Sequence, residues 1–403
     1  MIPRRLTPKI LAILKKMPIA TITGPRQSGK TTLLKNAFPK FRYVSLEALN
    51  ARRFAQADPR QFLTVYKPPA ILDEVQHVPD LFSYIQTLTD ETNKPGQYIL
   101  SGSQHFGLMA KITQSLAGRT AIFTLLPLSL SELIAAKFSL PDLNHLLFKG
   151  FYPRVWSQNL DPLKWYPDYI QTYLERDIRQ LKQITDLVKF KNFLQLCAGR
   201  TGQLLNLSSL ANDAGISHNT AAAWISVLET SYIVFRLHPY YRNFNKRLIK
   251  SPKLYFYDPG LVCSLLGIET PAQIQTHPLR GQIFETFVVS ELRKIRFHVG
   301  RQPNDYFLRD NRGREIDYLI DSAGKLTPIE IKIGQTVNDD YFDNLKFWQP
   351  IISASPADSF VIYGGNQTQP RRFATVVGWK NLSVFENPSR LGSPDSTAPK
   401  STS

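Results

Sequence analysis

Two short stretches of this chain carry residues whose types and spacing suit chemistry. The first, GPRQSGKT at 24–31, fits the pattern G-x-x-x-x-G-K-[S/T] at every position. Glycines in such a loop let backbone N–H groups point at phosphate oxygens, the lysine adds positive charge, and the last hydroxyl is a ligand for Mg²⁺. The stretch therefore predicts a phosphate-binding loop made of Gly24, Pro25, Arg26, Gln27, Ser28, Gly29, Lys30, Thr31 and Thr32.

A downstream acidic segment fits the same site. Residues 70–75, AILDEV, form an apolar run that contains Asp73 and Glu74 at its end, as the Walker B segment of an ATPase does. We expect Thr31 and Asp73 to hold the Mg²⁺ of a bound ATP, and Glu74 to orient or deprotonate the attacking water. Two acids at a strand end are by themselves usually a solvated edge, but the upstream loop gives them this meaning.

Further polar residues are candidates for sensing the γ-phosphate. Ser103 and Gln104 follow the apolar run at 98–101, where ATPases of this kind place a polar sensor. Arg119, in SLAGRTAIF, is a candidate arginine finger or phosphate sensor. A structural salt bridge is the alternative for Arg119.

The second stretch lies in the last third of the chain. In REIDYLIDSAGKLTPIEIK, residues 314–332, apolar and polar residues alternate on both sides of Ala323-Gly324, which predicts a β-hairpin. A turn at that dipeptide places Asp317 opposite Glu330, with their Cβ atoms about 5 Å apart. Alternation along the second strand puts Lys332 on the same face as Glu330.

These paired carboxylates suggest a metal site. Opposed carboxylates repel one another unless a cation lies between them, and Mg²⁺ takes such oxygen ligands. Lys332 would then steady the attacking water or the scissile phosphate. Glu285, among apolar neighbours in the helical pattern of residues 281–294, is a candidate third ligand. The alternatives are a hairpin with one ion-paired polar face and a Glu285 solvated at a helix edge.

Length, charge and cysteine content limit the classes of protein. A chain of 403 residues exceeds one ordinary core, so we expect two to four domains. The 49 Lys and Arg against 32 Asp and Glu leave +17, which favours an anionic partner, nucleic acid before an acidic membrane surface; a merely basic, solvated surface is the alternative. No apolar run reaches the ~18 residues of a membrane span, and Cys197 and Cys263 lie far apart, so we expect a reduced, cytoplasmic protein without a zinc site.

The pattern of apolar residues changes along the chain. Short apolar runs alternate with helical stretches up to about residue 145, which predicts a parallel sheet covered on both faces, the αβα sandwich of a P-loop NTPase. From residue 207, two short helices joined at Gly215 and a β-rich segment are typical of a winged helix-turn-helix. We expect an α/β multidomain chain: an ATPase domain at 1–145, a helical connector at 146–185, a winged helix-turn-helix at 186–262, an α/β domain at 263–386 and a disordered tail at 387–403.

Basic and aromatic residues gather at and behind the second of those helices. Basic side chains bind backbone phosphates, and aromatic rings stack on bases. We therefore expect DNA to bind here; the alternatives are a solvated wing or a surface that docks on another domain. His218, Asn219 and Thr220 open the expected recognition helix, and Arg236, Tyr240, Tyr241, Arg242, Phe244, Lys246, Arg247, Lys250 and Lys253 follow it.

Together these segments resemble a prokaryotic family of AAA-type ATPases with a C-terminal domain of unknown function related to PD-(D/E)XK, or restriction-endonuclease-like, nucleases. The resemblance runs from TGPRQSGKTTLL through ILDEVQ, LSGSQ, YLERDI and KLYFYDPGL to GQIFETFV, GREIDYLI and PIEIKIG. It implies ATP and Mg²⁺ as ligands, a winged-helix middle, and a homo-oligomer, because relatives often form rings. It also implies a nuclease-like end that carries Glu285, Asp317, Glu330 and Lys332.

Two functions remain open at this point. The first is a Mg-dependent ATPase, producing ADP and phosphate, that is coupled to nucleic-acid binding and to DNA cleavage by the C-terminal domain. The second is a non-nucleolytic, ATP-dependent regulator whose C-terminal domain binds protein or DNA.

Overall fold

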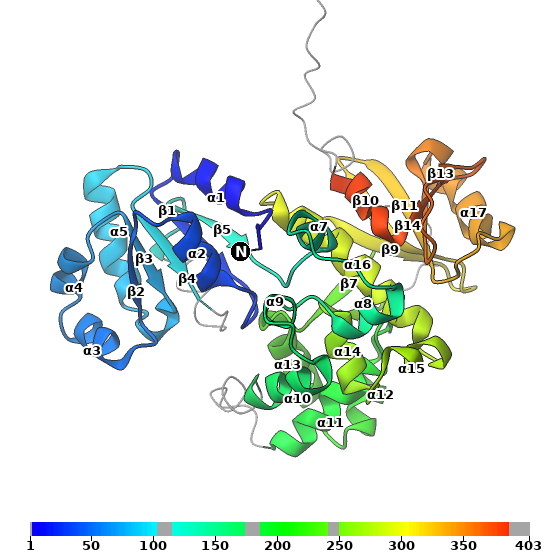
Figure 1. Ribbon diagram of the computed structural model, residues 1–403, viewed down its shortest axis with the longest axis horizontal. Coiled ribbons are helices and arrows are strands. Elements are labelled where there is room, and N and C mark those ends of the chain that lie inside the picture. Colours follow the sequence, from blue (N-terminus) through cyan, green and yellow to red (C-terminus); the bar gives the residue numbers. More distant parts are fainter. Residues whose placement is uncertain (1, 103–114, 174–185, 241–249, 387–403) are drawn as a thin grey trace, which may run out of the picture.

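The computed structural model describes residues 2–102, 115–173, 186–240 and 250–386. Figure 1 shows three regions: an α/β region (blue to cyan), a helical middle (green) and a second β-rich region (yellow to red). Helices α7 and α16 lie where the three regions meet. No helix among the described residues is long and apolar enough to cross a membrane.

Five parallel strands form the N-terminal sheet within the described part of the chain, in the order β2-β3-β4-β1-β5. The central strands are buried throughout because helices cover both faces, as the alternating pattern predicted. Successive residues of β3 show this, since Ala70 and Leu72 belong to one core cluster and Ile71 to the other. The strands are β1 Ile19–Thr23, β2 Arg42–Ser45, β3 Ala70–Asp73, β4 Tyr98–Ser101 and β5 Thr120–Thr124.

The helices of this region follow the apolar spacing of the sequence. The expected amphipathic N-terminal helix is present as α1, which buries Ile10 and Leu14 against the sheet. The helices are α1 Thr7–Leu14, α2 Lys30–Ala37, α3 Leu49–Ala57, α4 Pro59–Val65, the 3-10 turn η1 Val75–His77 and α5 Leu81–Thr92.

The middle region contains the expected pair of short helices. In α12, Leu210 and Ala211 are buried, and Gly215 makes the turn with a φ of 63°. Ser217 then caps α13 by accepting a hydrogen bond from the backbone N–H of Thr220. The helices are α7 Leu130–Ala135, α8 Leu143–Lys149, α9 Pro153–Ser157, α10 Pro162–Tyr173, α11 Leu187–Ala198, α12 Leu207–Asp213, α13 His218–Thr230, α14 Pro259–Leu265 and α15 Pro271–Thr276.

A second sheet, the C-terminal sheet, joins the middle and last regions. Among the described residues it has the strand order β13-β14-β12-β11-β10-β9-β7-β8-β6, and β7 pairs in parallel with β9. One core cluster likewise runs from Leu126 to Phe385. Both regions therefore share a sheet and a core across the boundary that we expected near residue 262. The strands are β6 Gln203–Leu204, β7 Val234–Pro239, β8 Lys253–Phe256, β9 Asp305–Arg309, β10 Glu315–Ser322, β11 Lys325–Lys332, β12 Phe360–Tyr363, β13 Gln369–Pro370 and β14 Thr375–Gly378.

The hairpin predicted at Ala323-Gly324 is confirmed. Strands β10 and β11 pair with Ser322 opposite Lys325 and Tyr318 opposite Ile329. Both turn residues have positive φ, 55° and 92°, as a tight two-residue hairpin turn requires. The remaining helical elements of this region are α16 Arg280–His298, η3 Asp339–Phe342, α17 Asp343–Ile352, η4 Pro356–Asp358 and η5 Trp379–Glu386.

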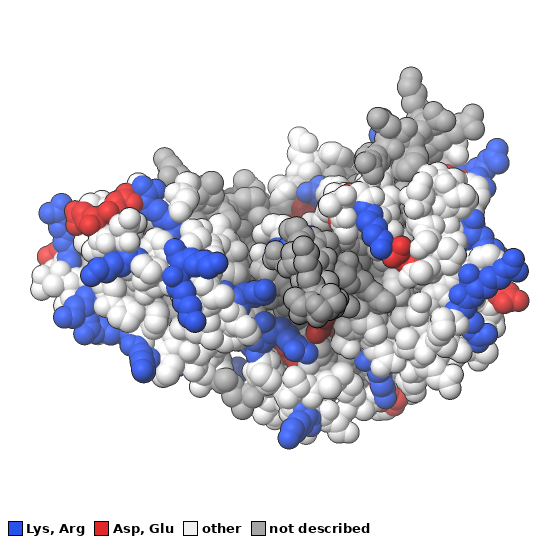
Figure 2. Space-filling model, turned by 90° about the horizontal axis from the view of Figure 1, so that it is seen from above, with Lys and Arg blue, Asp and Glu red and all other residues white. Residues whose placement is uncertain are grey.

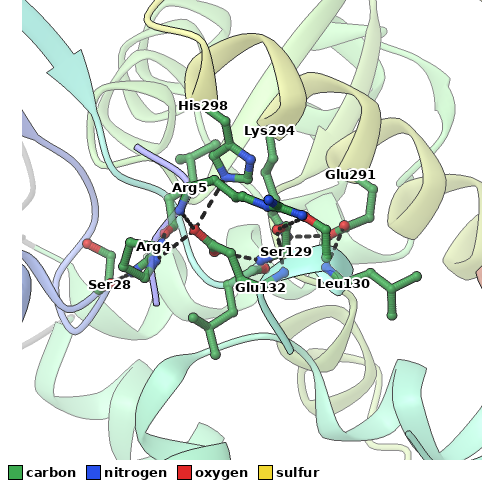
Figure 3. A network of polar contacts seen from close by, with 12 residues as sticks. Arg4, Arg5, Ser28, Ser129, Leu130, Glu132, Glu291, Lys294 and His298 are labelled. Atoms are coloured by element: carbon green, nitrogen blue, oxygen red, sulfur yellow. Dashed lines mark hydrogen bonds and ion pairs between the residues drawn. The ribbon is translucent and has the colours of Figure 1, made fainter. Parts of the chain in front are cut away.

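A buried polar network, centred on Arg4 and Glu132, ties the three regions together (Figure 3). The Arg4 guanidinium donates to the carbonyl of Ser28 in the phosphate-binding loop at 2.6 Å and to that of Leu126 at 2.6 Å. It also pairs with the Glu132 carboxylate at 3.1 Å, and the side chains of both residues are at most 5% exposed. The same carboxylate caps α7 by accepting from the N–H of Ser129 and lies 3.8 Å from Nε2 of His298 on α16.

Helix α16 completes the network from the other side. Its Glu291 accepts from the N–H of Leu130 at 2.7 Å, and its Lys294 donates to Glu291 and to the carbonyl of Leu128. Burial alone would raise the pKa of Glu132, but Arg4 and His298 reverse this and lower it. The carboxylate therefore stays charged in the protein interior.

We predict that Arg4→Met costs stability, because it leaves Glu132 as a buried carboxylate without its main counter-charge. Breaking a buried pair from one side costs about 3–5 kcal/mol. The midpoint of urea denaturation measures this loss. Arg5→Met is the matched control, since Arg5 is half exposed and its pair with Glu386 at 3.4 Å is worth at most about 1 kcal/mol. Equal losses in the two variants would contradict the prediction.

Candidate functional site

The loop at 24–31 connects the end of β1 to the start of α2, as its motif predicted. Gly24 has a φ of 146°, and a Cβ there would lie 2.1 Å from the carbonyl oxygen of Leu125. Gly29 caps α2 with a φ of 92°. Both positions therefore require glycine, because a side chain would strain the backbone or collide with β5 and its following residues.

Three side chains converge at the carboxyl ends of the parallel strands beside this loop. The Thr31 hydroxyl donates to Oδ2 of Asp73 at 2.6 Å, and the Tyr43 hydroxyl donates to the same oxygen at 2.8 Å. Ser101, at the end of β4, donates to Oδ1. Burial and the nearby Asp73 raise the pKa of the Tyr43 phenol, so it remains a donor. The phosphate-binding loop and the acidic strand end thus meet, although a full strand, β4, lies between β1 and β3.

Lys30 and Glu74 lie next in the chain to the residues of this contact. The Lys30 ammonium is buried and donates to the carbonyl oxygens of Gly24 and Pro25 at 3.0 and 2.9 Å. Glu74 has a positive φ of 55°, which is uncommon for a residue with a side chain. Its carboxylate accepts a hydrogen bond from the side-chain amide of Gln76.

The loop opens into a cavity of about 1020 Å³ between the N-terminal and middle regions. Arg26, Lys30 and Glu74 of the N-terminal region line it, together with Arg154 of α9 and Tyr169 of α10. Arg154 donates to the side chain of Gln158 one turn later in the chain. Sequence patterns did not identify Arg154, because nothing in its neighbourhood indicates that α9 folds over the loop.

The three candidate phosphate sensors have different outcomes. Arg119 comes just before β5, whose first residue pairs with the first residue of β1. It therefore lies at the amino ends of these strands, whereas the phosphate-binding loop follows the carboxyl end of β1. Its guanidinium forms a two-pronged pair with Asp90 at 2.5 and 2.8 Å, which is the structural salt bridge considered as its alternative. Within one chain, Arg119 therefore lies in this salt bridge and away from the phosphate-binding loop. Ser103 and Gln104 lie outside the described residues.

The hairpin carboxylates form a second site. Asp317 accepts a hydrogen bond from the backbone N–H of Ile331 at 2.7 Å, which fixes it against β11. Glu330 accepts from Lys332 at 2.7 Å and from Asn344 at 3.1 Å through Oε1. Its buried Oε2 has no hydrogen-bond partner in the described part of the chain.

Glu285 joins this site together with a residue that we had not singled out. One carboxylate oxygen each from Glu285, Glu315 and Asp317 lies within 4.8 Å of the others, and these three residues are called the acidic cluster below. Glu315 carried a usable signal, because it lies two residues before Asp317 on a predicted strand and so shares its expected face. The helix and the hairpin thus bring Glu285 and Asp317 together as expected, but the cluster contains Glu315 where Glu330 was expected.

A lysine fills the acidic cluster. The Lys253 ammonium, 3% exposed, lies 2.8 Å from Glu285 and 2.5 Å from Glu315. The hydroxyl of Tyr255 donates to the same Glu285 oxygen at 2.5 Å. Burial alone would lower the pKa of Lys253, but Glu285 and the other acids raise it well above its ordinary value, so the ammonium stays charged.

The predicted DNA-binding residues are therefore only partly exposed. Lys253 faces the acidic cluster, Arg236 forms a two-pronged pair with Glu229 at 2.8 and 2.7 Å, and Tyr240 is buried beside Tyr306. Lys253 and Tyr240 are thus buried, contrary to their expected exposure, whereas Arg236 stays partly exposed beside Glu229. Lys250, His218 and Asn219 are exposed. Tyr241, Arg242, Phe244, Lys246 and Arg247 lie outside the described residues.

Positive charge is spread widely over the surface. Figure 2 shows Lys and Arg side chains at both ends of the viewed face, with Asp and Glu scattered among them. The net charge of +17 is therefore carried by several regions rather than by one compact element on this face.

We predict that Asp317→Asn stabilises the protein. Burial, followed by the charge of Glu330, raises the pKa of Asp317 well above its ordinary value. The folded state then binds this proton more tightly than the unfolded state, so stability falls as pH rises above about 4. Asparagine keeps an acceptor for Ile331 and removes this pH-dependent loss of stability.

Thermal denaturation between pH 4 and pH 8 measures this effect. The advantage of Asp317→Asn over the wild type is expected to grow with pH. Asp339→Asn, at an exposed position of the same region, is the control and should change stability by less than about 0.5 kcal/mol. An advantage that shrinks with rising pH would contradict the prediction.

Three protein-family models match successive parts of the chain. Residues 16–134 match an AAA domain, residues 140–272 match a domain of unknown function (DUF8612), and residues 280–382 match another (DUF4143). Among solved structures, the Walker-type ATPase PABY2304 of Pyrococcus abyssi is 15% identical, with a TM-score of 0.45, over 66% of this chain and 96% of that protein.

Relatives extend over most of the chain. The uncharacterized protein Rv2008c of Mycobacterium tuberculosis is 30% identical over 325 residues, which are 79% of this chain and 71% of that protein. The uncharacterized protein MJ1637 of Methanocaldococcus jannaschii is 26% identical over 292 residues, 60% of this chain and 61% of that protein. The chain belongs to the same family as Rv2008c, and its N-terminal region is an AAA-type P-loop ATPase domain.

Proposed function

We propose that the protein binds Mg-ATP at the phosphate-binding loop and hydrolyses it to ADP and phosphate. The observation that carries this proposal is the hydrogen bond from Thr31 to Asp73, which brings the two parts of an ATPase site together from α2 and β3. Thr31 and Asp73 are oxygen ligands of the kind that Mg²⁺ prefers. Bound there, the ion would neutralise charge on the β- and γ-phosphates.

The remaining roles follow from position. Lys30 would exchange its bonds to the loop carbonyls for phosphate oxygens, and Glu74 would orient or deprotonate the attacking water. The residues of 24–32 would enclose the phosphates with their backbone N–H groups. Arg154 also lines the cavity and is our candidate for a positive charge near the γ-phosphate. Ser103 stays a proposed sensor.

We predict that Lys30→Ala abolishes nucleotide binding, because it removes the buried positive charge of the loop. Glu74→Gln should keep nucleotide binding and lose turnover by at least about 100-fold, as expected for a general base. Titration with a fluorescent ATP analogue measures binding, and phosphate release measures turnover. Lys40→Ala is the control, since Lys40 is exposed after the end of α2. Wild-type nucleotide affinity in Lys30→Ala would rule out this site.

We further propose that the middle region binds DNA as a winged helix. Helices α12 and α13 with strands β7 and β8 have the order of such a domain, and exposed His218 and Asn219 begin α13. The net charge of +17 supports an anionic partner. The rival is a regulator that binds protein and whose positive charge has no specific partner.

We also propose that the last region is a metal-dependent nuclease of the restriction-endonuclease-like type. The buried, unpartnered Oε2 of Glu330 fits a cation, as do the carboxylates of Glu285 and Asp317 nearby. A bound Mg²⁺ would activate water and stabilise charge on the phosphate. In this chain, Lys332 beside Glu330 would hold the scissile phosphate. Glu285 and Asp317 would position the ion on one side of the phosphate.

We predict that DNA binding weakens steeply with salt, because phosphate contacts release counterions. A gel-shift series from about 50 to 200 mM salt should lower the affinity at least tenfold. Binding that is absent or indifferent to salt would favour the protein-binding rival. A nuclease assay with Mg²⁺ tests the nuclease proposal. Asp317→Ala and Lys332→Ala should remove Mg²⁺-dependent cleavage and leave ATP hydrolysis intact. Cleavage that survives both changes would exclude the nuclease proposal.

A further inference from the structure

The acidic cluster takes its counter-ion from another region of the chain. Lys253 is the first residue of β8, which belongs with the helices of the middle region, whereas Glu285 lies on α16 and Glu315 begins β10. The Lys253 ammonium reaches both carboxylates, at 2.8 and 2.5 Å. It is almost fully buried, at 3% exposure. The ammonium of Lys253 is therefore held in one position within the acidic cluster.

A divalent ion and this ammonium compete for the same oxygens. A metal ion requires carboxylate oxygens to converge on it at roughly 2.0–2.6 Å. Oε1 of Glu285 and Oε1 of Glu315 both accept from Lys253 in this arrangement, and Glu285 Oε1 also accepts from Tyr255. Two cations in one cluster of this size would repel each other strongly at low dielectric. Occupation by one therefore excludes the other.

We propose that Lys253 is a built-in competitor that closes the metal site of the nuclease-like region, so that a divalent ion binds only after the ammonium has left. This inference rests on the metal site of the proposed function. Glu330 supplies an independent sign that the pocket suits a cation, because its buried Oε2 has no partner among the described residues although Oε1 is bound by Lys332 and Asn344. The four-carbon stem of Lys253 allows the ammonium to swing away without moving β8.

The test is Mn²⁺ binding to the full chain without nucleotide, followed by electron paramagnetic resonance of free Mn²⁺. Lys253→Met keeps the length of the side chain and removes its charge. We expect Lys253→Met to bind one Mn²⁺ at least tenfold more tightly than the wild type. Lys253→Arg keeps the charge and should resemble the wild type. The double variant Lys253→Met/Asp317→Asn should lose the gain, which locates the ion in the acidic cluster.

Each outcome separates the competitor from the metal site itself. Equal, tight Mn²⁺ binding by the wild type and Lys253→Met, lost in Asp317→Asn, would overturn the competitor and leave the metal site intact. Absence of Mn²⁺ binding in both would overturn the competitor and the proposed metal site together. A gain that persists in the double variant would also overturn the competitor.

Folding supplies a second readout, because Lys253→Met and Lys253→Gln leave the carboxylates without their ammonium. If these variants melt early, Mn²⁺ should restore their melting temperature and leave that of the wild type nearly unchanged. Variants that Mn²⁺ does not restore would contradict the proposal, since a divalent ion must be able to take the place of the ammonium.

Discussion

The buried pair of Arg4 and Glu132 is the constraint on which the arrangement of the three regions depends. One guanidinium holds the phosphate-binding loop through Ser28, the segment after β5 through Leu126, and α7 through Glu132. Because the carboxylate has almost no contact with water, it requires this partner to remain charged. The loop that would bind nucleotide is therefore fixed directly to the start of the middle region.

Helix α16 extends this constraint to the acidic cluster. Lys294 and His298 in its second half contact the Arg4–Glu132 network or its neighbours, while Glu285 in its first half contacts Lys253. A single helix thus carries residues of both charged sites. Regular backbone hydrogen bonding makes such a helix move as a unit over this length. Helix α16 therefore connects the Arg4–Glu132 network to the acidic cluster through one continuous element.

Local patterns explain what the sequence predicted well. The phosphate-binding loop, the acidic end of β3 and the turn at Ala323-Gly324 depend on neighbouring residues and on the period of a strand, which are visible in the sequence. The position of Lys253 depends instead on the order β8-β7-β9-β10, in which distant segments become neighbours. The salt bridge of Arg119 likewise depends on distant segments, because its partner Asp90 lies on α5 and its end of β5 lies away from the loop. The local residue pattern does not reveal the order of strands that lie far apart in the sequence.

The parallel pairing of β7 with β9 has a consequence for synthesis on the ribosome. Strand β7 pairs with β8 on one side as soon as both have emerged, but its other edge acquires a partner only after α16 has been made. During that interval the end of β7 at His238 and Pro239, which pairs with Tyr306 and Phe307 of β9, lacks its partner strand. Such an edge is a template for pairing with another nascent chain. The shared sheet thus leaves this end of β7 uncovered until the last region has been translated.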